Sequence, residues 1–150
     1  MHSMTEQELA TALAAVYARR EKLRRLHDER LAGKGYKSME DLSSEDAAWV
    51  KGPFRKEQKA ITKEVLRLRK LIPAATADDL AKIGEKDVNF GTSNHGEKIL
   101  LILKLSHCAG LEQEDKRMLI VGEEWAKLKF DPPQAVLDAI ELPADVREIA

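Results

Sequence analysis

Residues 53–72 read PFRKEQKAITKEVLRLRKLI, and this stretch decides the fold because it carries a seam whose positions recur at alternating intervals of four and three. The seam positions are Phe54, Gln58, Ile61, Val65, Leu68 and Ile72. Such spacing is typical of a long helix that buries one stripe against another helix. The single polar member, Gln58, is expected to fix the register, and Pro73 is expected to end the helix.

A second long helix is predicted near the start of the chain. Thr5 and Glu8 have the spacing of a capping box, in which each side chain accepts a hydrogen bond from a backbone amide at the helix start. Apolar residues then follow at helical intervals: Leu9, Leu13, Val16, Leu23 and Leu26. We expect this helix to reach about Leu31 and to end at Gly33 and Gly35.

The segment between the two helices is predicted to be a loop over residues 33–42, followed by a short helical turn that Ser43 or Ser44 caps. Gly52–Pro53 is expected to interrupt that turn, with the second long helix beginning at the proline. Two long helices joined by a loop predict an antiparallel, coiled-coil-like hairpin. The sequence therefore predicts an all-α fold.

The second half of the chain carries shorter helical signals. Helices are predicted over residues 76–84, 112–129, 134–141 and 143–149. Residues 97–105 contain the run ILLIL, which fits either a buried helix, the preferred interpretation, or a central strand. We expect two parts: a helical hairpin at 5–72 with a basic outer face, packed on or linked to a compact acidic helical lobe at 76–150.

Composition limits the classes of protein. The chain has 150 residues and a net charge of −1, but residues up to Ile72 carry a net +5 and the remainder −6. Its single cysteine, Cys108, excludes an internal disulfide, so a cytoplasmic location is expected. No apolar run approaches 18 residues, and the first residues lack a signal-peptide pattern, so no membrane association is predicted.

Basic residues crowd the predicted hairpin and make nucleic acid a possible partner. The candidate contact residues are Arg19, Arg20, Arg24, Lys34, Tyr36, Lys37, Arg55, Lys59 and Lys63, of which the tyrosine is a candidate for stacking on a base. Acidic residues lie among them, however, and mixed charge is also how an ordinary solvated helix looks. The loop sequence GKGYKS lacks the first glycine and the preceding strand of a phosphate-binding loop.

A hairpin buries only one stripe, so its seam needs a third helix or another chain. Phe54, Ile61, Val65 and Leu68 are therefore candidate interface residues, either between copies of the chain or against the acidic lobe. From these features we expect a non-enzymatic, oligomeric helical binding or regulatory protein that acts through protein–protein contacts. The alternative is a small DNA-binding assembly or regulatory protein that uses the basic hairpin.

A further alternative is an enzyme or anion site around Ser93, Asn94 and His95, where a helix start follows a hydroxyl and an amide. Such residues more often cap their own helix, and the sequence offers no nucleophile and orienting acid for the histidine. No catalytic residue is assigned. No cofactor is expected, and no metal site is expected because the chain lacks paired cysteines and zinc-binding histidine motifs.

Overall fold

The computed structural model describes residues 4–74, 76–78, 95–106 and 132–147, and their regular structure is entirely helical. The all-α prediction is confirmed for these residues. The helices are α1 (Glu6–Leu31), α2 (Ser44–Trp49), α3 (Arg55–Arg69), α5 (His95–Ser106), α8 (Gln134–Asp138) and α9 (Ala144–Arg147), with a 3-10 turn η1 (Met39–Asp41) and a π-helical turn η2 (Val50–Phe54). None of the described helices is long and apolar enough to cross a bilayer.

The predicted start of α1 is confirmed. The Thr5 hydroxyl accepts a hydrogen bond from the Glu8 amide at 3.1 Å, and the Glu8 carboxylate accepts one from the Thr5 amide, also at 3.1 Å. The helix ends at Leu31, and Gly33 and Gly35 follow with φ of 73° each. Because residues other than glycine rarely adopt that backbone conformation, the two glycines allow the chain to turn away from α1.

The predicted interruption of the short helical turn at Gly52–Pro53 is wrong, and the second long helix, α3, begins at Arg55 and not at the proline. α2, η2 and α3 follow one another without a break, and Pro53 lies inside η2. Proline lacks an amide hydrogen and crowds the turn before it. A π-helical turn is locally wider than an α-helix, because its hydrogen bonds span five residues, and it accommodates Pro53 within a continuous helical run.

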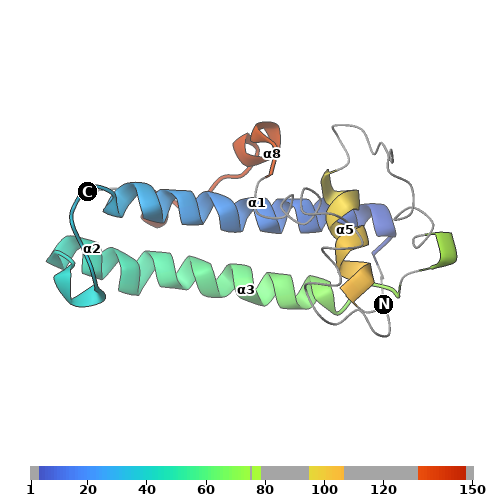
Figure 1. Ribbon diagram of the computed structural model, residues 1–150, viewed down its shortest axis with the longest axis horizontal. Coiled ribbons are helices and arrows are strands. Elements are labelled where there is room, and N and C mark those ends of the chain that lie inside the picture. Colours follow the sequence, from blue (N-terminus) through green and yellow to red (C-terminus); the bar gives the residue numbers. More distant parts are fainter. Residues whose placement is uncertain (1–3, 75, 79–94, 107–131, 148–150) are drawn as a thin grey trace.

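α1 and α3 lie side by side and run in opposite directions, with α2 at one end of the pair (Figure 1). Ile61, Val65 and Leu68 of α3 are buried in one core cluster with Leu9 and Leu13 of α1. Burying a side chain of this size contributes about 1.5–3 kcal/mol.

The polar residue on the α3 side of this core is not the predicted one. Gln58 is exposed, whereas the neighbouring Glu57 is only 4% exposed and forms an ion pair with Arg19 of α1. Glu57 therefore carries the register contact that the seam pattern assigned to Gln58.

The segment for which helix and strand both remained open forms a helix, α5, which packs against α1 at the end of the pair away from α2 (Figure 1). Ile99, Leu100 and Leu103 join the common core. The approach is very close at Gly96, where an added Cβ would lie 2.1 Å from the carbonyl oxygen of Ala10. Glycine at this position lets the α5 backbone contact the α1 backbone.

Residues 132–147, here called the C-terminal arm, contain α8 and α9 and follow the α1–α3 pair toward α2. The Lys22 ammonium donates to the carbonyl oxygens of Leu137 at 3.1 Å and Ile140 at 2.6 Å. The Trp49 indole donates to the carbonyl oxygen of Val146 at 3.0 Å. These contacts attach the arm to α1 and to α2.

The short helices predicted at 134–141 and 143–149 correspond to α8 and α9 within the described part of the arm. The predicted helix at 112–129 and most of the one at 76–84 lie outside the described residues. The division into a hairpin at 5–72 and a lobe at 76–150 therefore stays a prediction.

Candidate functional site

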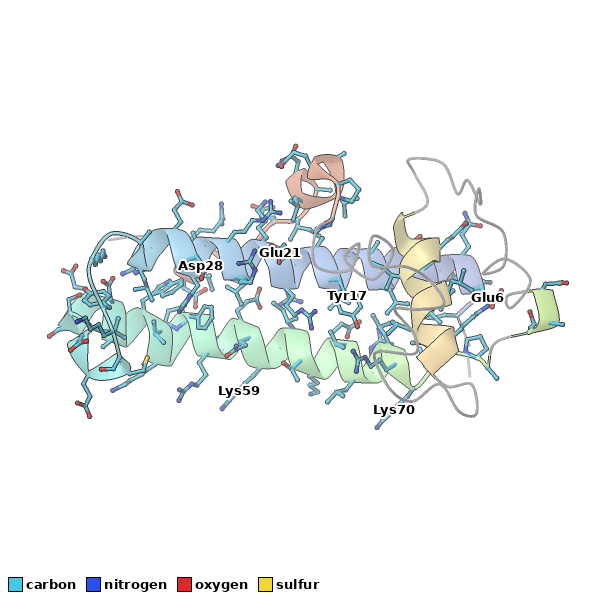
Figure 2. All side chains as sticks on the ribbon, viewed as in Figure 1. Glu6, Tyr17, Glu21, Asp28, Lys59 and Lys70 are labelled. Carbon is cyan, nitrogen blue, oxygen red and sulfur yellow. The ribbon has the colours of Figure 1, made fainter. Side chains whose placement is uncertain are left out.

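One face of α3 gathers exposed cations. Successive residues of an α-helix point about 100° apart around its axis. With Glu57, Ile61 and Leu68 buried on one side, the side chains on the opposite side are those of residues 55, 56, 59, 63 and 70. These residues form what is called here the α3 cationic face: Arg55, Lys56, Lys59, Lys63 and Lys70, all exposed. Figure 2 shows Lys59 of α3 and Lys70, the residue directly after α3, extending on the side away from α1.

Within the described part of the chain, the five side chains of the α3 cationic face form no hydrogen bond or ion pair. The two acidic residues of α3 are engaged elsewhere. Glu57 accepts two hydrogen bonds from Arg19, and Glu64 accepts two from Arg67, one of them 3.0 Å long. The hydrogen bonds from Arg67 are the main cause that lowers the pKa of the Glu64 carboxyl. Among the residues that the structure describes, no acidic side chain therefore neutralises the charges of the α3 cationic face.

Several cations of α1, in contrast, form ion pairs with buried or neighbouring acidic side chains. Arg24 donates to Glu21 at 3.0 Å and to Asp28 at 2.8 Å, and Arg25 donates to Glu21 at 3.1 Å. The hydrogen bond from Arg24 is the main cause that lowers the pKa of the Glu21 carboxyl. Arg20 lies over the ring of Tyr17, 4.8 Å from its centroid.

Asp46 organises the basic residues at the α2 end of the pair. Its carboxylate accepts hydrogen bonds from Arg30 at 2.9 Å, Lys34 at 2.7 Å and the Tyr36 hydroxyl at 2.9 Å. These donors, Lys34 first, hold the pKa of the Asp46 carboxyl well below its ordinary value. The Tyr36 hydroxyl also accepts a hydrogen bond from the Ser43 amide at 3.2 Å, so this tyrosine is part of the loop structure.

The structure divides the nine sequence-predicted nucleic-acid residues. Arg55, Lys59 and Lys63 lie together on the α3 cationic face. The other six lie elsewhere: Arg19 inside the α1–α3 pair, Arg20 and Arg24 on α1, and Lys34, Tyr36 and Lys37 in the loop that follows. Lys56 and Lys70 belong to the face although sequence reasoning did not select them. Their positions around the helix were the available signal, because Lys56 precedes Lys59 by three positions and Lys63 by seven, and Lys70 follows Lys63 by seven.

The four candidate interface residues pack inside one chain. Ile61, Val65 and Leu68 are buried in the core, and Phe54 is partly buried against it. The Phe54 ring also contacts the His27 and Trp49 rings, at centroid distances of 4.7 and 5.2 Å. α1 and the neighbouring elements thus cover the seam for which the sequence left a second copy and the C-terminal lobe as alternatives.

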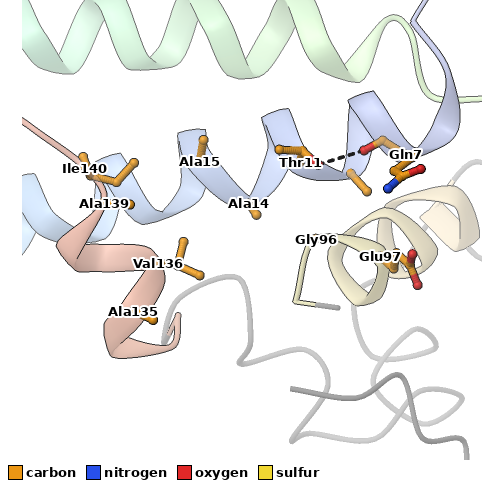
Figure 3. A pocket seen from close by; sticks show the side chains of 11 residues that line it. Gln7, Thr11, Ala14, Ala15, Gly96, Glu97, Ala135, Val136, Ala139 and Ile140 are labelled. Atoms are coloured by element: carbon orange, nitrogen blue, oxygen red, sulfur yellow. Dashed lines mark hydrogen bonds between the residues drawn. The ribbon is translucent and has the colours of Figure 1, made fainter. Parts of the chain in front are cut away.

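Cavities border α1 at two places in the part of the chain that the structure describes. One, of about 440 Å³, lies between α1, α5 and α8, and Figure 3 shows Ala14, Gly96 and Val136 on its walls. Its Thr11 hydroxyl donates to the Gln7 carbonyl within α1 at 3.0 Å. The other, of about 360 Å³, is a groove between α1 and α3 with Leu23 and Ile61 among its lining residues. The described walls of neither cavity hold a nucleophile paired with a base.

The described residues add no candidate metal ligand or catalytic residue to those considered from the sequence. Among the residues that the structure describes, no group of three or more histidine, cysteine, aspartate or glutamate side chains has the arrangement of a metal site. Of the alternative enzyme or anion site, Ser93 and Asn94 lie outside the described residues, and the His95 side chain is likewise not described.

In comparisons with protein-family models, curated proteins and solved structures, nothing matches this chain.

Proposed function

We propose that the protein is a non-enzymatic binding protein and that it contacts nucleic acid through the α3 cationic face. The observation that carries this proposal is the segregation of charge on α3. Five exposed cations share one side of the helix, while Glu57 and Glu64 are held in ion pairs with Arg19 and Arg67.

The physical basis is the release of counterions. Nucleic acid carries a condensed layer of counterions, and each phosphate that a lysine or arginine neutralises releases some of them. A cation that already has an acidic partner gains less from a phosphate, because its ion pair must first be broken. Among the described residues, the cations of the α3 cationic face have no ion pair to break. Arg24 has two, with Glu21 and Asp28.

In this proposal the outer side of the predicted hairpin is the binding surface, and the described helix α8 lies away from it. In Figure 1 α8 lies on the α1 side of the pair, opposite α3. Acids close to the α3 cationic face would repel phosphate, and α8, which ends at Asp138, belongs to the opposite side of the pair.

A second candidate is an acidic protein surface, and Leu66 favours it. This leucine is 54% exposed and projects from α3 between the cations. An exposed apolar side chain surrounded by cations suits a protein partner that has an apolar patch with an acidic rim. Oligomer formation through Ile61, Val65 and Leu68 has less support, because these side chains are buried within one chain.

Binding to a fluorescent 24-base-pair DNA at 50 mM and 200 mM salt tests the proposal. We expect measurable binding at low salt and a loss of about tenfold or more in affinity at high salt. The double variant Lys59→Gln/Lys63→Gln is expected to weaken low-salt binding by about tenfold. The matched control Arg24→Gln/Lys37→Gln removes two cations outside the face and is expected to change the affinity by less than about threefold.

Two results contradict the proposal: no binding at 50 mM salt, or equal losses in the two double variants. Leu66→Ser distinguishes the second candidate, because it leaves every charge in place. It is expected to leave the affinity for DNA unchanged, whereas a protein contact centred on Leu66 would weaken.

A further inference from the structure

We infer, on the basis of the proposed nucleic-acid function, that the ligand is double-stranded and that it is bound without preference for base sequence. The α3 cationic face presents charge along a line but offers neither a stacking platform nor a base-reading element. Three features of the described residues lead to this conclusion.

The first feature is the length of the face. Arg55 and Lys70 are 15 positions apart, which corresponds to about 22 Å along a helix. A stretch of duplex DNA of that length carries about 13 phosphate charges, counting both strands. Five cations on flexible side chains can therefore each meet a phosphate in many alignments, so no particular register on the duplex is required.

The second feature is the absence of aromatic side chains on the face. Proteins that bind single strands without sequence preference combine cations with aromatic rings on which the bases stack. Arg55–Arg69, all of which the structure describes, contains no aromatic residue. Tyr36, the stacking candidate from the sequence, lies in the loop next to α2, with its hydroxyl hydrogen-bonded to Asp46 and Ser43.

The third feature is the lack of a base-reading element. Recognition helices place residues near their N-terminus in the major groove. The N-terminus of α3 is instead continuous with η2 and α2, so no free helix start projects from it. Four of the five cations are lysines, which act as point charges, whereas the bidentate reading of guanine is most typical of arginine.

The experiment compares four ligands of 20 nucleotides or base pairs: an A·T-rich DNA duplex, a G·C-rich DNA duplex, one strand of mixed sequence and a duplex RNA. We expect the two DNA duplexes to bind with affinities within about twofold of each other and the single strand to bind at least about fivefold more weakly. Preference for either duplex form, DNA or RNA, supports the inference, because both present a paired backbone.

The salt dependence gives an independent readout. Five phosphate contacts predict a slope of log K against log salt of about −4.5 for duplex DNA. The variant Lys56→Gln/Lys70→Gln is expected to make this slope shallower by about two, equally on both DNA duplexes. Both lysines are exposed, and an unchanged circular dichroism spectrum checks that the variant is folded.

The outcomes separate the inference from the proposed function. If no nucleic acid binds, both fail. If the single strand binds as tightly as the duplex, or if one DNA sequence is favoured by tenfold or more, the inference is wrong, while the proposed function stands provided that Lys59→Gln/Lys63→Gln still weakens binding.

Discussion

Arg19 of α1 and Glu57 of α3 form a two-point ion pair across the helical pair, with Arg19 Nε 3.0 Å from Glu57 Oε2. Glu57 is almost fully buried, so its carboxylate depends on this one arginine for compensation of its charge. Removing one partner of a buried pair is costly because it leaves an uncompensated charge, whereas replacing both with apolar residues often is not.

We therefore expect Arg19→Met to lower the free energy of unfolding by about 3 kcal/mol. The double variant Arg19→Met/Glu57→Leu is expected to regain most of this loss, because it removes the buried charge as well. Urea unfolding followed by circular dichroism measures both values. A single variant as stable as the wild type would show that the pair is not needed to compensate Glu57.

Asp46 is expected to make stability fall in acid. Its donors Lys34, Tyr36 and Arg30 hold its pKa in the folded state below the unfolded value of about 3.9. The folded state therefore binds fewer protons at this carboxyl than the unfolded state does. The resulting stabilisation is complete above about pH 5 and is lost as the pH falls through about 4 and below.

Comparison with Asp46→Asn isolates this contribution from those of other carboxyls. The difference in free energy of unfolding between wild type and variant is expected to be constant from pH 7 to about pH 5 and to shrink at lower pH. A difference that stays the same down to pH 2 would mean that the three donors do not stabilise the charged form of Asp46.

The contact between α5 and α1 is expected to tolerate only glycine at position 96. A Cβ there would meet the Ala10 carbonyl oxygen at 2.1 Å, so Gly96→Ala must push the two helices apart. Overpacking of this kind costs about 1–3 kcal/mol. Gly52→Ala is the matched control, because nothing lies within 4 Å of its added Cβ. Thermal unfolding of the two variants is informative, and equal melting temperatures would contradict the close approach.

Trp49→Phe is expected to loosen the C-terminal arm. The substitution keeps an aromatic ring in the core but removes the indole N–H, which leaves the Val146 carbonyl without this donor. An unsatisfied buried group costs about 1–3 kcal/mol. Hydrogen exchange should accelerate in residues 142–147 more than in α3, and Leu66→Ala, at an exposed site, should leave both segments unchanged. Uniform acceleration in the two segments would argue against a local anchoring role for Trp49.

The helical frame was predictable from the sequence because its signals are local. The capping box at Thr5 and Glu8 and the seam through Ile61, Val65 and Leu68 depend on residues within a few turns of one another. The path of the chain at Pro53 was not predictable in the same way. A proline usually ends a helix, and only the structure shows the π-helical turn that accommodates it.

The buried charged residues were the least predictable part of the structure, because their ion-pair partners are far away in the sequence. Glu57 is paired with a residue 38 positions away, and Lys104 with one 98 positions away. A helical pattern alone assigns such residues to the solvated side. The α3 cationic face was only partly predictable, because the angle of each basic residue around α3 assigns it to the face only once the buried side of the helix is known.

The anchors of the C-terminal arm carry a consequence for the order of folding during synthesis. Lys22 and Trp49 donate to carbonyl groups 97 to 118 positions later in the chain, so these hydrogen bonds form only after those residues are synthesised. The residues of α1 and α3, in contrast, are all synthesised once residue 72 has left the ribosome. Domains fold from the N-terminal side as they emerge, and closing the longest loops carries the largest entropic cost. We therefore expect the first 72 residues to fold first and the C-terminal arm to pack against them last.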